Sequence, residues 1–171
     1  VSNLPKNFDG YRIVQVSDMH IGTFNGWRRF ILEHEMDSIK HQNANLIVFT
    51  GDLQNMRPSE ILPFTNLLKT SMKNAIAVRG NHDYTEYVKL NPKEAEQQNN
   101  DFANIVRHKL GWNLLENNHI TIKRGNDSIV IAGTENDGKP PFPQKANYQK
   151  ALQGVAKGAF VIMLQHDPSA W

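Results

Sequence analysis

The chain has 171 residues, which predicts one domain spanning residues 1–171 that can bury a hydrophobic core without help from disulfides. Its 19 basic and 17 acidic residues give a net charge of +2, so the composition offers no reason to expect a nucleic acid partner. Cysteine is absent, which excludes disulfides, thiolate metal sites and a cysteine nucleophile.

The first predicted strand, residues 11–17, is mostly apolar and is followed by Asp18 and His20. In extended backbone, the side chains of residues i and i+2 project to the same side, so this carboxylate and this imidazole can bind one ion together. Taken alone, the two residues fit a helix-capping loop equally well. The next element is predicted to be an amphipathic helix with the apolar stripe Leu32, Met36 and Ile39.

The second predicted strand, residues 46–50, ends at Gly51 and Asp52, where a glycine lets the backbone turn tightly so that the carboxylate faces inward. A helix capped by Ser59 is predicted to follow. The third strand, residues 75–79, ends in a run of side chains that can bind metal or move protons. That run is Gly80, Asn81, His82 and Asp83. On its own it would more often be an ordinary polar turn.

Strand, helix, strand, helix, strand at this spacing predicts parallel strands joined by right-handed crossovers, with functional groups at their carboxyl ends. Three later strands, residues 113–116, 120–123 and 128–132, are predicted to form a second, antiparallel layer. A short helix over residues 148–155 and a strand over 160–164 then lead to His166. Tyr84 and Tyr87 could line a substrate cleft or pack against it, and the sequence favours packing.

Four predicted strands therefore end in residue types that bind metals. As a set, these motifs resemble the calcineurin-like metallophosphoesterase superfamily; they are Asp18-x-His20, Gly51-Asp52, Gly80-Asn81-His82-Asp83 and His166. The first motif in its wider form, Val16-Ser17-Asp18-x-His20-x-Gly22, and the stretch Gln165-His166-Asp167-Pro168 look most like a bacterial branch. In that branch the catalytic domain follows membrane helices or an export signal. The resemblance implies an α/β fold, a four-layer α/β/β/α sandwich with two mixed sheets, with two metal ions at the strand ends.

The resemblance also assigns the ligands. Asp18 and His20 would bind the first ion, Asn81 and His166 would bind the second, and Asp52 would bridge both. A bridging carboxylate holds two ions about 3.5 to 4 Å apart, where they acidify a shared water and clamp the phosphoryl oxygens. Mixed nitrogen and oxygen ligands suit Mn, Fe or Zn better than Ca or Mg.

By the same resemblance His82 would be the catalytic acid that protonates the leaving oxygen, a role worth roughly a hundredfold to ten-thousandfold. In many relatives a carboxylate orients this histidine, but Asn55 stands at that position here. An amide can hold the ring by a hydrogen bond, yet it cannot stabilise an imidazolium as a carboxylate does. We therefore expect either a weaker acid–base group at His82 or a replacement role for Asp83.

The final Gly-His-x-His motif of the family, which adds one ligand to each metal, does not occur in the sequence. From this we expect the last strands to be missing, each ion to keep three ligands, and the 171-residue piece to be impaired. The chain does not begin with methionine, so a removed amino-terminal segment could anchor the protein to a membrane. Membrane association, on either side, and a cytoplasmic location both stay open.

The sequence favours a dinuclear-metal phosphohydrolase acting on a phosphodiester or pyrophosphate, with a substrate that could be lipid-linked. The alternative is a non-catalytic phosphate-binding or interaction domain on the same scaffold, which Asn55 supports. Against it, a scaffold without catalysis has no physical need for so many polar groups at one edge. A nuclease of the same chemistry is disfavoured by the near-neutral charge.

Overall fold

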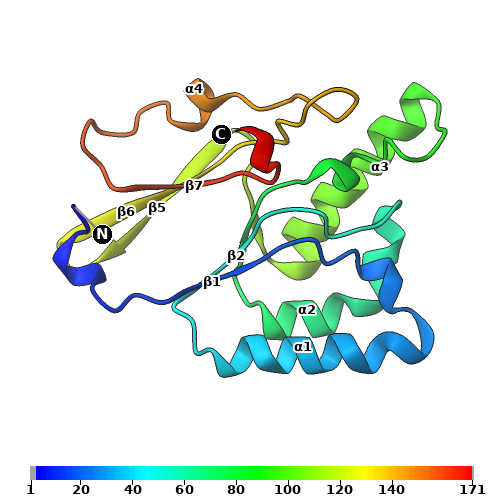
Figure 1. Cartoon of the computed structure of the whole chain (residues 1–171), viewed down its shortest axis with the longest axis horizontal. Coiled ribbons are helices and arrows are strands. Elements are labelled where there is room, and N and C mark those ends of the chain that lie inside the picture. Colours follow the sequence, from blue (N-terminus) through cyan, green and yellow to red (C-terminus); the bar gives the residue numbers. More distant parts are fainter. Residues whose placement is uncertain (1–2, 171) are drawn as a thin grey trace.

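A computed structural model describes residues 3–170 (Figure 1). Within them, the α-helices are α1 (Arg29–His41), α2 (Thr65–Ser71), α3 (Pro92–Asn104) and α4 (Tyr148–Ala151). The strands are β1 (Ile13–Val16), β2 (Leu46–Phe49), β3 (Ile76–Ala77), β4 (Asn113–Leu114), β5 (Asn118–Arg124), β6 (Asp127–Gly133) and β7 (Val161–Leu164). No helix among the described residues has both the length and the apolar character needed to cross a membrane.

The first sheet has the order β1-β2-β3-β4 and is parallel throughout its described strands. The parallel arrangement of its first three strands is confirmed, but the expectation that this sheet is mixed is wrong. The expectation that the stretch around Asn113 belongs to the antiparallel layer is also wrong. Helix α3 carries the chain back to the amino end of the sheet, so β4 enters in the same direction as β3, and Asn113 N donates to Ala75 O at 2.9 Å.

The second sheet has the order β5-β6-β7 and is mixed, as expected. Strands β5 and β6 form an antiparallel hairpin closed beside Gly125, whose φ of +59° is in the left-handed region. Strand β7 then pairs parallel with β6 and ends at Leu164, opposite Gly133 at the carboxyl end of β6. The residues that follow β7 bring His166 next to the first sheet, where its Nδ1 lies 2.8 Å from Thr50 O.

Alternate residues of β2 build two separate cores, as the two-residue period of a strand requires. Phe49 packs with the helices that cover one face of the first sheet, together with Leu32 and Leu68. Val48 points to the other face and packs against the second sheet, where Ile131 is fully buried. The first sheet therefore lies between a helical layer and the second sheet.

The outer face of the second sheet is covered by α4 (Figure 1). His119 on β5 links the two, because its Nδ1 lies 2.8 Å from Ala151 O. The four-layer α/β/β/α order expected from the sequence is therefore present, with a thin outer helical layer. Helix α4 ends four residues before the expected boundary at residue 155.

The helix expected after Ser59 is divided in two. A 3₁₀ helix runs over Pro58–Phe64, and α2 begins only at Thr65. Pro63 lies at the division, since a proline has no N–H for a continuous α-helical hydrogen-bond ladder. Helix α3 continues into a π-helical segment over Ile105–Leu110, which ends at Gly111 with a φ of +71°.

Candidate metal centre

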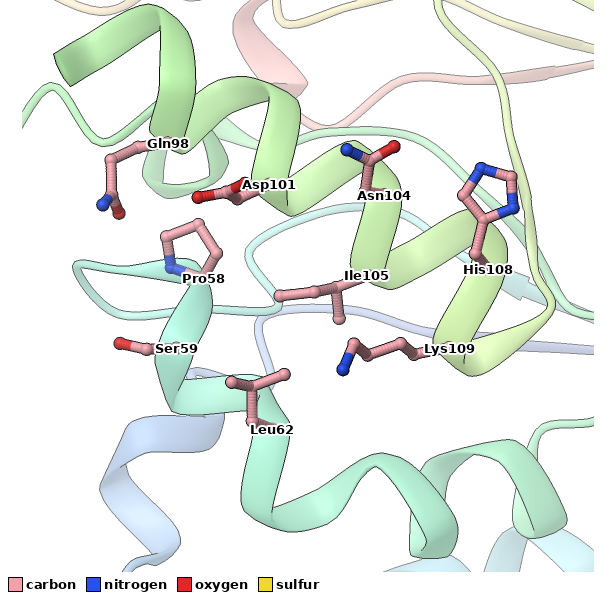
Figure 2. Close-up of a pocket in the computed structure, with 9 residues that line it drawn as sticks. All are labelled: Pro58, Ser59, Leu62, Gln98, Asp101, Asn104, Ile105, His108 and Lys109. Carbon is pink, nitrogen blue, oxygen red and sulfur yellow. The ribbon is translucent and has the colours of Figure 1, made fainter.

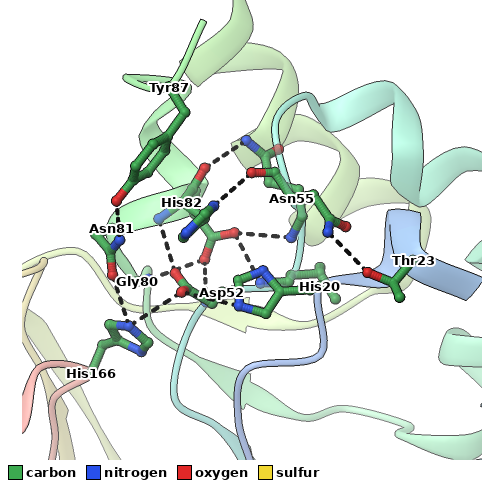
Figure 3. A network of polar contacts seen from close by, with 12 residues as sticks. His20, Thr23, Asp52, Asn55, Gly80, Asn81, His82, Tyr87 and His166 are labelled. Carbon is green, nitrogen blue, oxygen red and sulfur yellow. Dashed lines mark hydrogen bonds and ion pairs between the residues drawn. The ribbon is translucent and has the colours of Figure 1, made fainter.

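Asp52 is the centre of the site that the strand ends form (Figure 3). It follows β2 and is 3% exposed. Its Oδ2 lies 3.5 Å from Nε2 of His20, which follows β1, and 3.5 Å from Nε2 of His166, which follows β7. One buried carboxylate oxygen therefore faces imidazoles from both sheets.

Two groups of side chains bring potential ligand atoms within 4.8 Å of one another, and Asp52 belongs to both. One group is His20, Asp52 and His82, and the other is Asp18, Asp52 and His166. The shared position of Asp52 fits the expected bridging role. In the metal-free chain Asp18 lies near His166, and His82 lies near His20; the division of the ligands between two ions stays a prediction.

Two glycines let the loops after β2 and β3 touch each other. A Cβ added at Gly80 would lie 2.2 Å from Asp52 Oδ1, and one added at Gly51 would lie 2.4 Å from Gly80 N. The close approach allows His82 N to donate to Asp52 Oδ1 at 2.9 Å. That hydrogen bond occupies Oδ1 and leaves Oδ2 turned toward the imidazoles.

Three of the expected ligands have left-handed backbone conformations. The φ values are +54° at Asp18, +44° at His20 and +61° at Asp52. Such a conformation costs a residue with a Cβ roughly 1–2 kcal/mol, and strain of this kind concentrates at functional sites. The strained positions therefore coincide with the edge where the ligand groups meet.

Asp83 is fully buried and holds the loop after β2 rather than the ring of His82. Its carboxylate accepts hydrogen bonds of 2.9 to 3.2 Å from the backbone N–H groups of Gly80, Asp52, Leu53 and Gln54. Burial and the nearby charge of Asp52 nevertheless raise the pKa of Asp83 to about 6. With its oxygens committed to the backbone, Asp83 does not take over the orienting role considered for it.

The ring of His82 is held by a main-chain carbonyl. Its Nδ1 lies 2.7 Å from the backbone oxygen of Asn55, whereas the Asn55 side-chain amide donates to Thr23 Oγ1 at 3.0 Å. The Asn55 side-chain amide therefore does not hold the ring. Because a carbonyl can only accept, Nδ1 carries the hydrogen and Nε2 is the free nitrogen.

Tyr87, for which the sequence offered either a place in a substrate cleft or packing against it, contacts two of the expected site residues. Its ring stacks on His82 with centroids 4.1 Å apart and planes 15° apart. Its hydroxyl accepts a hydrogen bond from Nδ2 of Asn81, whose Oδ1 lies 3.1 Å from His166 Nε2. Tyr84, by contrast, is buried and its hydroxyl donates to Glu135. The two tyrosines have the same sequence signal, so only the path of the turn distinguishes them.

The charges of Asp52 and His166 support each other. Burial alone would lower the pKa of His166, but the Asp52 carboxylate and the Thr50 carbonyl raise it to about 9. Burial would likewise raise the pKa of Asp52, yet His166 and the backbone N–H of His82 hold it below its ordinary value. In the metal-free chain a proton on His166 therefore occupies the lone pair that an ion would need.

Apart from the metal centre, a second hollow, a cavity of about 380 Å³, lies between the Pro58–Phe64 helix and α3 with its extension over Ile105–Leu110 (Figure 2). It is called the second cavity below. Its lining includes Leu62, Ile105 and His108, and none of the expected ligands. This cavity is therefore not part of the candidate metal centre.

Comparison with known proteins gives a consistent family. The family model described as calcineurin-like phosphoesterase matches residues 11–170. A Danio rerio protein named "Transmembrane protein with metallophosphoesterase domain" is 27% identical over 99% of this chain and 38% of its own length. "Uncharacterized metallophosphoesterase YkuE" of Bacillus subtilis is 25% identical over 99% of this chain and 55% of its own. The chain therefore spans about half or less of the length of these relatives.

Among solved structures, NAD nucleotidase (NadN) of Haemophilus influenzae superimposes with a TM-score of 0.54. The alignment covers 90% of this chain and 34% of that one at 12% identity, so it shows the fold alone. The fold, the potential metal-binding side chains at the strand ends and the family match over nearly the whole chain agree. The chain belongs to the calcineurin-like phosphoesterase family, whose members are metal-dependent hydrolases of phosphoester bonds.

Proposed function

We propose that the protein hydrolyses a phosphodiester or pyrophosphate with two divalent ions held at the carboxyl edge of the first sheet. The observation that carries this proposal is the position of Asp52 Oδ2, 3.5 Å from an imidazole nitrogen of His20 and 3.5 Å from one of His166. A single carboxylate that serves two ligand groups is what a two-ion site needs. The mixed nitrogen and oxygen donors suit Mn, Fe or Zn.

The residues present fit such ions in a second respect. Histidines that bind metals usually donate their other ring N–H to a carbonyl or carboxylate, which fixes the tautomer. His166 has this arrangement, because its Nδ1 lies 2.8 Å from Thr50 O and its Nε2 faces Asp52. The Asn81 amide oxygen lies beside the same nitrogen and supplies the oxygen donor of this group.

When bound, the ions supply an acidified water for attack on phosphorus and positive charge for the phosphoryl oxygens. His82 gives a proton from Nε2 to the leaving oxygen as the bond between phosphorus and that oxygen breaks. The carbonyl of Asn55 keeps Nδ1 protonated, so Nε2 is the nitrogen that exchanges the proton. A carbonyl carries no net negative charge, so it orients the ring of His82 without the charge compensation that a carboxylate would give.

The non-catalytic alternative rested on Asn55, and the geometry weakens it. The residue orients His82 through its backbone, which any amino acid at this position could supply. The Asn55 side chain instead ties the loop to Thr23. The absence of a carboxylate at position 55 therefore does not release the ring.

For the whole protein we propose a membrane-associated enzyme with a phosphoester carried on a lipid. The name of the Danio rerio relative, a transmembrane protein, supports the association. The net charge of +2 supports a substrate other than nucleic acid.

The first test combines elemental analysis with hydrolysis of bis-p-nitrophenyl phosphate in the presence of Mn. In the full-length protein we expect two ions per chain, and Asp52→Ala should lose both. His82→Ala should keep both and lose roughly a hundredfold in turnover of an alkyl phosphodiester, whose leaving oxygen needs a proton; this is the lower range for a general acid. His108→Ala, an exposed histidine of the second cavity, is the matched control and should change neither.

Three results would change the proposal. A full-length wild-type protein without metal and without turnover would reject the phosphohydrolase function, whereas the same result for the 171-residue piece alone is the expected impairment. Unchanged turnover of the alkyl phosphodiester in His82→Ala would remove His82 as the acid. Loss of one ion in His82→Ala would make His82 a ligand, as its place beside His20 and Asp52 permits.

A further inference from the structure

Tyr87 reaches the metal centre from a turn rather than from a strand end (Figure 3). The turn follows the short helix Asn81–Tyr84 and is set by Thr85, which has a φ of +59° and accepts a hydrogen bond from Val88 N at 3.2 Å. The side chain is 40% exposed, so burial in the core does not explain its position. Its two specific contacts are with His82 and Asn81.

The hydroxyl contact decides which way the Asn81 amide faces. An amide binds a cation only through its oxygen, and its two ends are nearly the same size. Nδ2 donates to the Tyr87 hydroxyl, and this turns Oδ1 toward His166. The same hydrogen bond can persist when Oδ1 binds an ion, because it uses the other end of the amide.

The ring contact limits the motion of His82. Tyr87 covers one face of the imidazole, and His20 meets it in a T-shaped contact with centroids 4.7 Å apart. The backbone oxygen of Asn55 holds Nδ1. With these three contacts the ring has one position, and a general acid must lie within hydrogen-bond reach of the leaving oxygen.

We propose that Tyr87 is the positioning residue of the centre, with its hydroxyl aiming the Asn81 oxygen at the second ion and its ring holding His82 for proton transfer. This inference rests on the proposed function. Tyr87 thereby couples two groups that otherwise depend on separate contacts, a metal ligand and the acid.

The first variant is Tyr87→Phe, which removes the hydroxyl and keeps the ring. We expect the apparent affinity for one of two Co²⁺ ions to fall about tenfold, the lower range for loss of a partner that orients a ligand. The affinity is read from the visible absorption of Co²⁺ in competition with a chelator, without turnover. Tyr11→Phe, at the opposite end of β1, is the control and should bind Co²⁺ as the wild type does.

The second variant is Tyr87→Leu, which also removes the stacked ring. Beyond the weaker Co²⁺ binding, at saturating metal we expect turnover to fall about tenfold or more for an alkyl phosphodiester, whose leaving alkoxide needs a proton, in keeping with the size of general-acid effects. Turnover of bis-p-nitrophenyl phosphate should change much less, since nitrophenolate leaves without protonation. Circular dichroism and thermal unfolding check that both variants are folded.

The outcomes separate the two proposals. If the wild type binds two ions and turns over while Tyr87→Phe keeps full Co²⁺ affinity, the hydroxyl role is wrong and the proposed function stands. If Tyr87→Leu slows both substrates equally, the ring does not act through the acid. If the wild type binds no metal and is inert, the function fails, and the role of Tyr87 fails with it.

Discussion

His166 carries a proton in the metal-free chain that metal binding must displace. Its pKa of about 9 lies above the ordinary 6.5, mainly because Asp52 and the Thr50 carbonyl outweigh burial. A raised folded-state pKa means that this pairing stabilises the metal-free chain fully below pH 6.5 and that the stabilisation is lost as pH rises through about 9. An ion bound at His166 would need the neutral imidazole, so metal affinity must rise as pH rises.

We therefore predict that metal binds more tightly as pH rises, by up to about tenfold per pH unit below pH 9, with a plateau above it. Chelator competition at a series of pH values measures this. His166→Gln should bind one ion more weakly and lose this component of the pH dependence. A flat affinity profile in the wild type would show that His166 is already neutral without metal.

Arg79 joins three elements behind the metal centre and is 4% exposed. Arg79 lies two residues after the end of β3. Its guanidinium donates to Glu116 Oε1 at 2.8 Å, to Asp83 O at 2.9 Å and to Asn99 O of α3 at 3.0 Å. Glu116 also pairs with Arg107, which is far more exposed, with 39% of its side chain accessible. One carboxylate thus has a buried and an exposed partner.

We predict that Arg79→Met lowers the free energy of unfolding by about 3–5 kcal/mol, because a buried pair loses one member and two carbonyls lose their donor. Arg107→Met is the matched control and should cost less than about 1 kcal/mol, as exposed ion pairs do. Urea denaturation measures both. Equal losses would mean that burial does not distinguish the two arginines.

At the scale of elements, the sequence predicted the strands that precede the expected ligands. It predicted less well the helices and turns that connect those strands. β1, β2 and β7 are apolar runs with ligands behind them, so both the strand and its carboxyl end could be predicted. Strand β4 has only two residues, too few for a periodic pattern, and its direction depends on how α3 returns the chain. The division of the helix near Pro63 could have been predicted, because a proline at that position interrupts an α-helix.

Across the whole molecule, the two cores are built without the expected ligands. The core under the helices includes Leu32 and Phe49, and the core between the sheets includes Val48 and Ile131. Each is made of apolar side chains, so packing continues when the site is empty. Metal binding should add to the stability of the fold rather than create it.

We predict that a chelator abolishes turnover and leaves the far-ultraviolet circular dichroism unchanged. Stability should fall only by the linkage amount, about 2.7 kcal/mol for each site that had been exposed to metal at a hundredfold excess over its Kd. Thermal unfolding with and without chelator measures this. Loss of helical signal on chelation would instead mean that the ligand loops organise the sheets.

The polar contacts of the site were only partly predictable. Asp18, His20, Asp52 and His166 follow strands whose carboxyl ends converge, so their meeting follows from topology. The hold on His82 comes from a backbone carbonyl, and every residue has one, so no side-chain pattern could reveal it. Tyr87 depends in the same way on the course of one turn.

The left-handed backbone at Asp18, His20 and Asp52 has a consequence for protein engineering. Glycine adopts such φ values at little cost, and asparagine does so more readily than most residues. A selection for thermal stability alone would therefore favour exchanging these three residues for glycine or asparagine. The most heat-resistant descendants would be those that had given up their ligands, so a selection for stability in this fold has to include catalysis from the first round.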